Sequence, residues 1–194
     1  MLRRIGCSWI SATAGGNGSA LPLAAVLAAG PADPKAILGT TGITTLSRLD
    51  GEPLAHWQRL AVAELLASLP ADTPGRIRQL VCVTQTPDQL IPTAAAVLRP
   101  GLAELGIAPA HQVDLGSGCS GYVDGLRLLE ALLAADGGGP ALGLLISGDL
   151  SSRLINRGDH ALASVFGDAV AADLLELAPP AVGGPATAGG ASSS

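Results

Sequence analysis

Two apolar runs constrain the fold of this chain more than any other feature: "IRQLVCVTQT" (residues 77–86) and "ALGLLISGD" (residues 141–149). Each has the length of a strand and alternates little with polar residues, as expected of strands that are buried on both faces of a sheet. Stretches with apolar residues at helical spacing lie around them, such as "PLAHWQRLAVAELLASL" (residues 53–69). Strands that alternate with helices predict an α/β layered domain.

The alternation continues to Ala178. Further strands are predicted at residues 2–10, 111–115 and 169–177, and further helices at residues 93–105, with a break near Pro100-Gly101, and 119–136. After Ala178 the sequence "PPAVGGPATAGGASSS" loses all periodicity and offers nothing to bury. We therefore expect one folded domain over residues 1–178 and a disordered tail over residues 179–194.

Composition argues against several classes of protein. Charged residues make up 14% of the chain and the net charge is −5, whereas nucleic-acid binders carry basic clusters. No uninterrupted apolar run approaches the roughly 18–20 residues of a membrane span. The cysteines are odd in number and unevenly spaced, which is typical of reduced thiols, and no spacing suggests a metal site. These features predict a soluble, cytoplasmic protein without nucleic-acid or membrane partners.

The main candidate functional residue is Cys119, in "VDLGSGCSGYVDGL" (residues 113–126). It follows a predicted strand through a Gly-Ser-Gly turn and stands at the start of a predicted helix. A helix N-terminus offers unpaired N–H groups and the positive end of the helix dipole, which favour a thiolate and suit an oxyanion. Cys119 is thus either a nucleophile that accepts an acyl group or a small buried residue between strand and helix. For Cys7 and Cys82, inside predicted strands, we expect plain core packing.

The segment "QVDLGSGCSGYVDGLRLLEALL" resembles the nucleophile segment of β-ketoacyl-acyl-carrier-protein synthase III, a family of the thiolase superfamily with a DxxxxCxG-type turn here. Four further segments resemble this family in order and spacing: "TTGITTLSRLDGE" (40–52), "VCVTQTPDQLIPTAAAVL" (81–98), "GLLISGDLSSRLI" (143–155) and "SVFGDAVAADLLE" (164–176). The resemblance runs from the start of the chain to about Leu177. It favours the nucleophile interpretation of Cys119.

The resemblance implies a thiolase-like half-fold. The family is built from two similar α/β halves, each with a five-stranded mixed sheet and helices on both faces, and this chain covers only the first half. In the family the second half supplies a histidine and an asparagine for decarboxylation and a glycine N–H for the oxyanion hole. His56, His111 and His160 all lie in the first half and are not their counterparts. We therefore expect an incomplete active site in this chain.

The resemblance also implies the substrate contacts. Cys119 would take the acyl group, and the flanking Gly118 and Ser120 would contact the substrate. A family residue at the position of Ile91 reaches towards the acyl tunnel of a neighbouring subunit. The family's Asp-Arg pair, near the coenzyme A nucleotide, is Asp159-His160 here.

Other family contacts to that nucleotide are replaced in this chain. Ala36 and Thr40 stand where the family carries a tryptophan and an arginine. As a separate departure from the family pattern, Ala169 and Ala171 stand where glycines are usual. The expected substrate is an acyl-CoA or the phosphopantetheine of an acyl carrier protein, with the contacts that hold coenzyme A reduced. We expect no bound cofactor and no metal.

Three functional classes remain open. The first is an acyltransferase of fatty-acid or polyketide type that takes an acyl group from a thioester and needs a partner for condensation. The second is a non-catalytic companion subunit of an intact ketosynthase, and the third is a truncated inactive copy. The expected partners are an acyl carrier protein and, in a homodimer or hetero-oligomer, a second copy, a C-terminal half or an intact ketosynthase. The resemblance places the dimer contact at the central strand, here Val81–Thr86.

Overall fold

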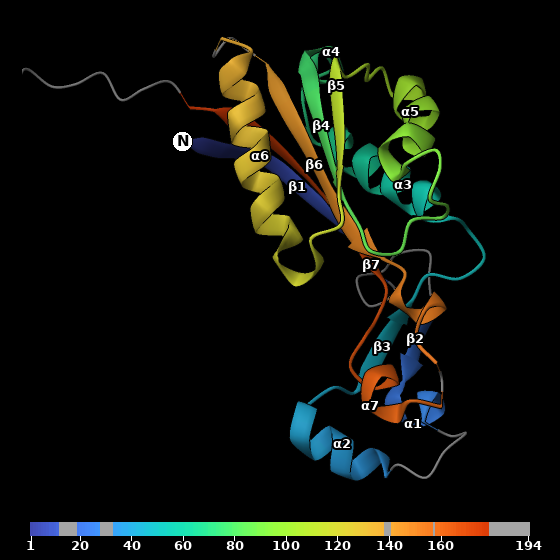
Figure 1. The fold of residues 1–194 in the computed structure, drawn as a ribbon. Helices are drawn as coiled ribbons and strands as arrows, with labels where there is room; N and C mark the ends of the chain where they lie inside the picture. Colours follow the sequence, from blue (N-terminus) through green and yellow to red (C-terminus); the bar gives the residue numbers. More distant parts are fainter. Residues whose placement is uncertain (12–18, 28–32, 138–140, 157, 179–194) are drawn as a thin grey trace, which may run out of the picture.

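The structure, a computed structural model, describes residues 1–11, 19–27, 33–137, 141–156 and 158–178 (Figure 1). Its centre is a five-stranded mixed sheet in the order β1-β7-β6-β4-β5. Strand β4 pairs in parallel with β5 and β6, whereas β7 pairs antiparallel with β6 and β1. The strands are β1 (Leu2–Ile10), β4 (Ile77–Val83), β5 (His111–Leu115), β6 (Leu142–Asp149) and β7 (Ala169–Leu177).

Helices cover both faces of this sheet, as the sequence predicts. Helices α3 (Leu54–Ala67) and α5 (Ala94–Glu104) pack on one face, and α6 (Gly121–Ala135) packs on the other (Figure 1). The short α4 (Thr73–Arg76) leads into β4. The apolar side chains of β4 and β6 fill two core clusters, one under each helical layer. The prediction that these two strands are buried on both faces is thus confirmed.

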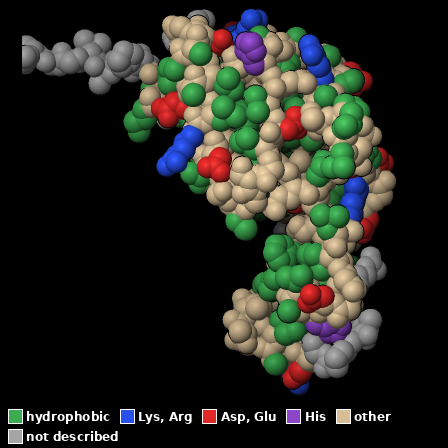
Figure 2. All heavy atoms as spheres, viewed as in Figure 1, with side chains coloured by type: hydrophobic (Ala, Val, Ile, Leu, Met, Phe, Trp, Pro, Cys, Tyr) green, Lys and Arg blue, Asp and Glu red, His purple; other side chains and the backbone are tan. Residues whose placement is uncertain are grey.

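A small lobe lies at the end of the sheet where β4, β5 and β6 finish (Figure 1). It contains the two-stranded sheet β2 (Ser19–Pro22) and β3 (Thr45–Arg48), with α1 (Leu23–Val26), α2 (Pro34–Thr41) and α7 (His160–Ala163). On the face shown in Figure 2, charged side chains are sparse, and hydrophobic side chains gather in patches on both parts of the molecule.

Helix α5 runs through Pro100 without interruption, so the predicted break near Pro100-Gly101 is wrong. Proline removes a backbone hydrogen bond and normally kinks or ends a helix. Here packing holds the helix on both sides of it, because Leu98 and Leu102 are buried in the core. Gly101 also lies so close to Arg59 of α3 that an added Cβ would meet that side chain at 2.7 Å. Tertiary contacts override the local preference.

The placement of the dimer contact at Val81–Thr86 does not agree with the sheet. Residues 81–83 belong to β4, which has β5 on one side and β6 on the other, so its backbone has no free edge. A strand can extend a sheet into a second molecule only from an edge. In the main sheet the edge strands among the described residues are β1 and β5.

Residues 179–194, for which a disordered tail is expected, lie outside the described residues. None of the helices in the described ranges is long and apolar enough to cross a bilayer.

Candidate functional site

Cys119 lies on the connection between β5 and α6, at the carboxyl end of the parallel strands (Figure 1). Residues Gly118–Ser120 form one 3-10 turn, and α6 follows directly from Gly121. Gly118 has a φ of +63°, a left-handed conformation that other residues rarely adopt. The turn leaves the Cys119 thiol exposed. It is therefore accessible to solvent and is not a buried packing residue.

The sequence predicts that α6 begins at Cys119, but the structure places this residue in the preceding turn. Ser120 is the N-cap of α6, and its side chain does not cap the helix N–H groups. Its hydroxyl instead lies 3.0 Å from the Ser117 carbonyl oxygen and 3.0 Å from the Asp124 carboxylate. The first N–H groups of α6, which begins two residues after Cys119, thus have no cap from Ser120.

Two buried glycines bring the Cys119 turn close to the sheet. A Cβ on Gly121 would meet Val83 at 2.6 Å, and a Cβ on Gly125 would meet Leu145 at 2.8 Å. Real Cβ atoms do not approach other atoms so closely, so α6 reaches its position on β4 and β6 only because both residues are glycine. The spacing of four residues between them is a sequence signal that the sequence analysis did not use.

Aspartates at the ends of strands tie the surrounding loops together. Asp114 of β5 accepts a hydrogen bond of 2.8 Å from the N–H of Ala95, at the start of α5. Asp149, the last residue of β6, accepts hydrogen bonds from backbone N–H and hydroxyl groups of residues 84–86. These bonds fix the loop after β4 relative to the loops after β5 and β6.

Asp168 completes this arrangement. It is fully buried, and it accepts hydrogen bonds from the N–H and hydroxyl of Ser152 and from the N–H of Leu49. Together with Asp114 and Asp149 it connects all five segments that carry the family resemblance. Segments that lie far apart in the sequence are therefore joined by hydrogen bonds around one end of the sheet.

An open pocket of about 150 Å³ lies beside the β5–α6 connection. The residues that line it come from the loop after β4, the start of α5 and the end of β5: Thr84, Pro87, Gln89, Leu90, Thr93, Ala94, Asp114, Leu115 and Gly116. Ile91 lies on the same loop and is 88% exposed. Ile91 thus lies on the loop that lines the pocket beside the connection that bears Cys119.

Asp159 and His160 lie in the small lobe, away from the Cys119 turn. Asp159 caps α7 by accepting a hydrogen bond from a backbone N–H of that helix. His160 lines a pocket of about 450 Å³ together with Ala36 and Thr40. Its Nδ1 is buried and has no hydrogen-bond partner within the described part of the chain. The three positions that the resemblance assigns to the coenzyme A nucleotide therefore meet in one pocket.

The other two cysteines differ from each other. Cys82 is fully buried in β4, as expected, and Gln58 donates a hydrogen bond of 3.2 Å to its sulfur. Burial, followed by the nearby Asp114 carboxylate, raises the pKa of Cys82 to about 12. The expectation of core packing for Cys7 is wrong, because β1 is an edge strand and leaves this side chain exposed.

The mixed five-stranded sheet with helices on both faces defines a thiolase-like α/β half-fold, with a cysteine on the turn before α6. The comparisons with known proteins name the family more narrowly. The family model of 3-oxoacyl-[acyl-carrier-protein (ACP)] synthase III matches residues 113–184. The β-ketoacyl-[acyl-carrier-protein] synthase III of Lactococcus lactis subsp. lactis is 35% identical over 115 residues, which are 59% of this chain and 34% of that protein.

Solved structures agree with the fold. The synthase III from Thermus thermophilus matches with a TM-score of 0.76 at 24% identity, over 90% of this chain and 51% of that one. The priming β-ketosynthase of the R1128 polyketide pathway matches with a TM-score of 0.74 at 20% identity, over 92% of this chain and 50% of that one. The resemblance to β-ketoacyl synthase III is confirmed: the chain is similar to this family in sequence over residues 113–184 and in fold over about 90% of its length.

The extent of the match is limited. The chain spans about half the length of these solved structures, and the matches cover 34% to 41% of the first curated relatives.

Proposed function

We propose that this chain carries the acyl-accepting part of a synthase III-type active site, with Cys119 as the nucleophile. The Cys119 thiolate attacks the carbonyl carbon of an acyl thioester. A new sulfur–carbon bond forms, the bond to the departing thiol breaks, and that thiol takes up the proton that Cys119 released. The observation that carries this proposal is the exposed thiol on a turn that Gly118 and Gly121 hold against the sheet.

The surroundings of Cys119 suit the charge that develops in this step. The first N–H groups of α6 point towards the N-terminal end of the helix, where they favour an oxyanion on the attacked carbonyl. The adjacent pocket, lined by Leu90, Leu115 and Ala94 among others, offers apolar contact to a short acyl chain. The relatives are named for β-ketoacyl synthesis on an acyl carrier protein and for polyketide priming, which supports fatty-acid or polyketide synthesis as the setting.

The carrier-protein thioester is the substrate that we propose over acyl-CoA. Among the residues that line the pocket with Ala36, Thr40 and His160, none is an arginine, a lysine or a tryptophan. A nucleotide with phosphate groups gains little binding free energy in this pocket, because proteins hold phosphate mainly through guanidinium and ammonium groups. The phosphopantetheine arm carries its thioester without needing those contacts.

Condensation needs residues that the lining of the pocket beside the β5–α6 connection does not provide, since no histidine is among them. We propose that a C-terminal half of the thiolase type supplies them, whether it continues this polypeptide or belongs to another chain. The outer side of α6 supports this assignment. Val123 is 52% exposed there, and Ala131 and Ala134 are exposed beside the charged Arg127, so short apolar side chains are available for packing along this side.

The test is intact-protein mass spectrometry after incubation with an acyl carrier protein thioester or the matching acyl-CoA. We expect an acyl adduct on the wild type and on Cys7→Ala, no adduct on Cys119→Ala, and slower labelling from acyl-CoA. With malonyl carrier protein we expect no ketoacyl product until a C-terminal half is added. Loss of one oxyanion donor alone typically costs about 10²–10³ in rate.

Two outcomes contradict the proposal. Ketoacyl product from this chain alone would show that the second half is not required. Absence of any adduct with every thioester would favour a companion subunit or an inactive copy.

A further inference from the structure

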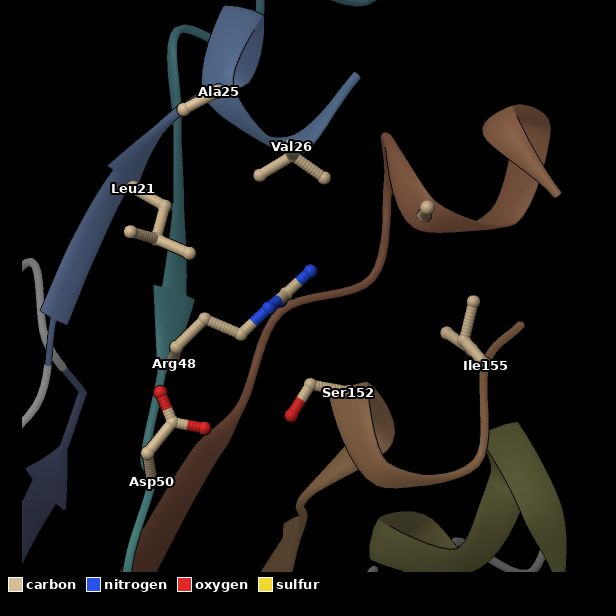
Figure 3. Close-up of a pocket in the computed structure, with 8 residues that line it drawn as sticks. Leu21, Ala25, Val26, Arg48, Asp50, Ser152 and Ile155 are labelled. Carbon is tan, nitrogen blue, oxygen red and sulfur yellow. The ribbon is translucent and has the colours of Figure 1, made fainter. Parts of the chain in front are cut away.

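Arg48, the last residue of β3, is buried at 8% exposure. Arginine is almost never buried without a partner for its charge. Its side chain extends from β3 into a pocket between the small lobe and the segment that follows β6 (Figure 3). Sequence analysis gave this residue no role.

Only part of the guanidinium is used by the protein. Nη1 donates hydrogen bonds to the carbonyl oxygens of Ser47 and Phe166, each at 3.0 Å. Within the described residues Arg48 has no ion pair and no further hydrogen bond. Towards the described residues, the Nε–Nη2 edge therefore keeps its donors. This edge has the fork geometry that binds a carboxylate through two parallel hydrogen bonds.

The pocket that Arg48 lines is small and mostly apolar. Its volume is about 180 Å³, and its apolar lining consists of Leu21, Ala25, Val26, Ile155 and Ala163. A cavity of about 150 Å³ holds a molecule the size of benzene, so this pocket suits a ligand with roughly six to eight non-hydrogen atoms.

The two other lining residues restrict the charge of the ligand. The Ser152 hydroxyl already donates to Asp168, so it offers the pocket a lone pair and not a donor. Asp50 is exposed and brings a negative charge to the same lining. A dianion such as phosphate is repelled there more strongly than a monoanion, and phosphate gains nothing from the apolar walls.

We propose that this pocket is a binding site for a small organic monocarboxylate. The carboxylate pairs with the Nε–Nη2 edge of Arg48, and a short hydrocarbon body contacts Val26, Ile155 and Ala163. The site is separate from the Cys119 turn, because none of its lining residues lines the pocket beside that turn. The proposal does not depend on acyl transfer by Cys119.

The test is a titration of the full chain with butanoate, followed by calorimetry and by amide NMR shifts of the pocket residues. Butan-1-amine and inorganic phosphate are the comparison ligands. We expect butanoate to bind the wild type and Cys119→Ala equally and to bind Arg48→Met at least tenfold more weakly. Arg127→Met, a change of an exposed arginine on α6, is the matched control and should bind like the wild type.

A second variant keeps the proposal testable if Arg48→Met does not fold. Ala25→Phe places a large side chain in the lining from an exposed position and leaves the charge in place, so it should block butanoate as well. The proposal is overturned if butanoate gives no shift in the wild type, if Arg48→Met and Ala25→Phe bind it as well as the wild type does, or if phosphate binds more tightly than butanoate.

Discussion

At the scale of single residues, the position of each cysteine in the sheet decides its chemistry. Cys119 is exposed on a turn next to the start of α6, Cys7 is exposed on the edge strand β1, and Cys82 is enclosed in β4. The raised pKa of Cys82 follows from enclosure first, because a thiolate in the apolar core loses its hydration.

Alkylation with iodoacetamide should separate the three thiols. We expect Cys119 to react fastest near neutral pH, Cys7 to follow, and Cys82 to react last. With a pKa of about 12 for Cys82, its thiolate fraction at pH 8 is on the order of 10⁻⁴. Its labelling should therefore increase only as the pH rises towards that value, or on unfolding. Peptide mass mapping gives the three rates.

The comparison between the two exposed thiols is the decisive one. Cys7 and Cys119 are both accessible, so a faster rate for Cys119 reports the electrostatic effect of the helix end. A rate for Cys119 no greater than that for Cys7 would contradict an activated thiol.

At the scale of elements, the placement of α6 rests on glycines that lie against the sheet. Gly125→Ala would bring a methyl group to 2.8 Å from Leu145. We expect a loss of about 1–3 kcal/mol in the free energy of unfolding, since added volume in a packed core forces side chains and backbone to shift. Acyl capture by Cys119 should also slow, because the turn moves with the helix. Urea denaturation and the mass-spectrometric assay measure the two effects.

Gly39→Ala is the control for this substitution. Gly39 lies inside α2 with nothing within 4 Å of an added Cβ. Alanine there should raise stability by about 0.5–1 kcal/mol, because it restricts the unfolded chain and favours the helix. Equal stability of the two variants would show that α6 does not depend on close approach.

The sequence predicts the long elements well and the short ones poorly. The strands at residues 2–10, 111–115 and 169–177 have the predicted bounds, because each is a run of strand-forming residues that ends at a turn. The strands and helices of the small lobe went unpredicted. All except the eight-residue α2 have four residues, as β2 and α1 do, and so short an element gives too short a pattern. Local sequence also does not tell an edge strand from a central one, which explains the error for Cys7.

For the candidate site, the sequence predicts the cysteine but not the residues that surround it in space. Cys119 stands out because glycines and a helical pattern surround it in the sequence itself. The pocket beside it was not predictable, because its walls come from residues 84–94 and 114–116, which meet only when β4 and β5 pair. Arg48 gave no signal, since its burial depends on contacts with segments more than 100 residues away, such as the Phe166 carbonyl.

At the scale of the whole molecule, the unpaired side of β5 is the place where a second copy can extend the sheet. We expect a homodimer at micromolar concentration, measured by sedimentation equilibrium. Val113→Lys, at the centre of β5, should shift it towards monomer, because charge on an edge strand opposes strand addition. Trp9→Lys, on the edge strand β1, is the matched control and should leave the dimer intact. A wild type that remains monomeric would contradict this prediction.

The aspartate carboxylates at the end of the sheet also affect local opening of the backbone, which amide hydrogen exchange measures. Amide hydrogens of Gln85, Thr86 and Ala95 bond to aspartate side chains, although they lie in loops or at a helix start. Such hydrogens exchange with deuterated water only when these hydrogen bonds break. The Thr86 amide also donates to the Thr84 hydroxyl oxygen, which itself bonds to Asp149. Since Asp149 holds both Gln85 and Thr86, those two should exchange in a single phase, slower than other loop amides and faster than the strands. The start of the loop after β4 would then open as one cooperative unit while the hydrogen bonds of the sheet stay closed.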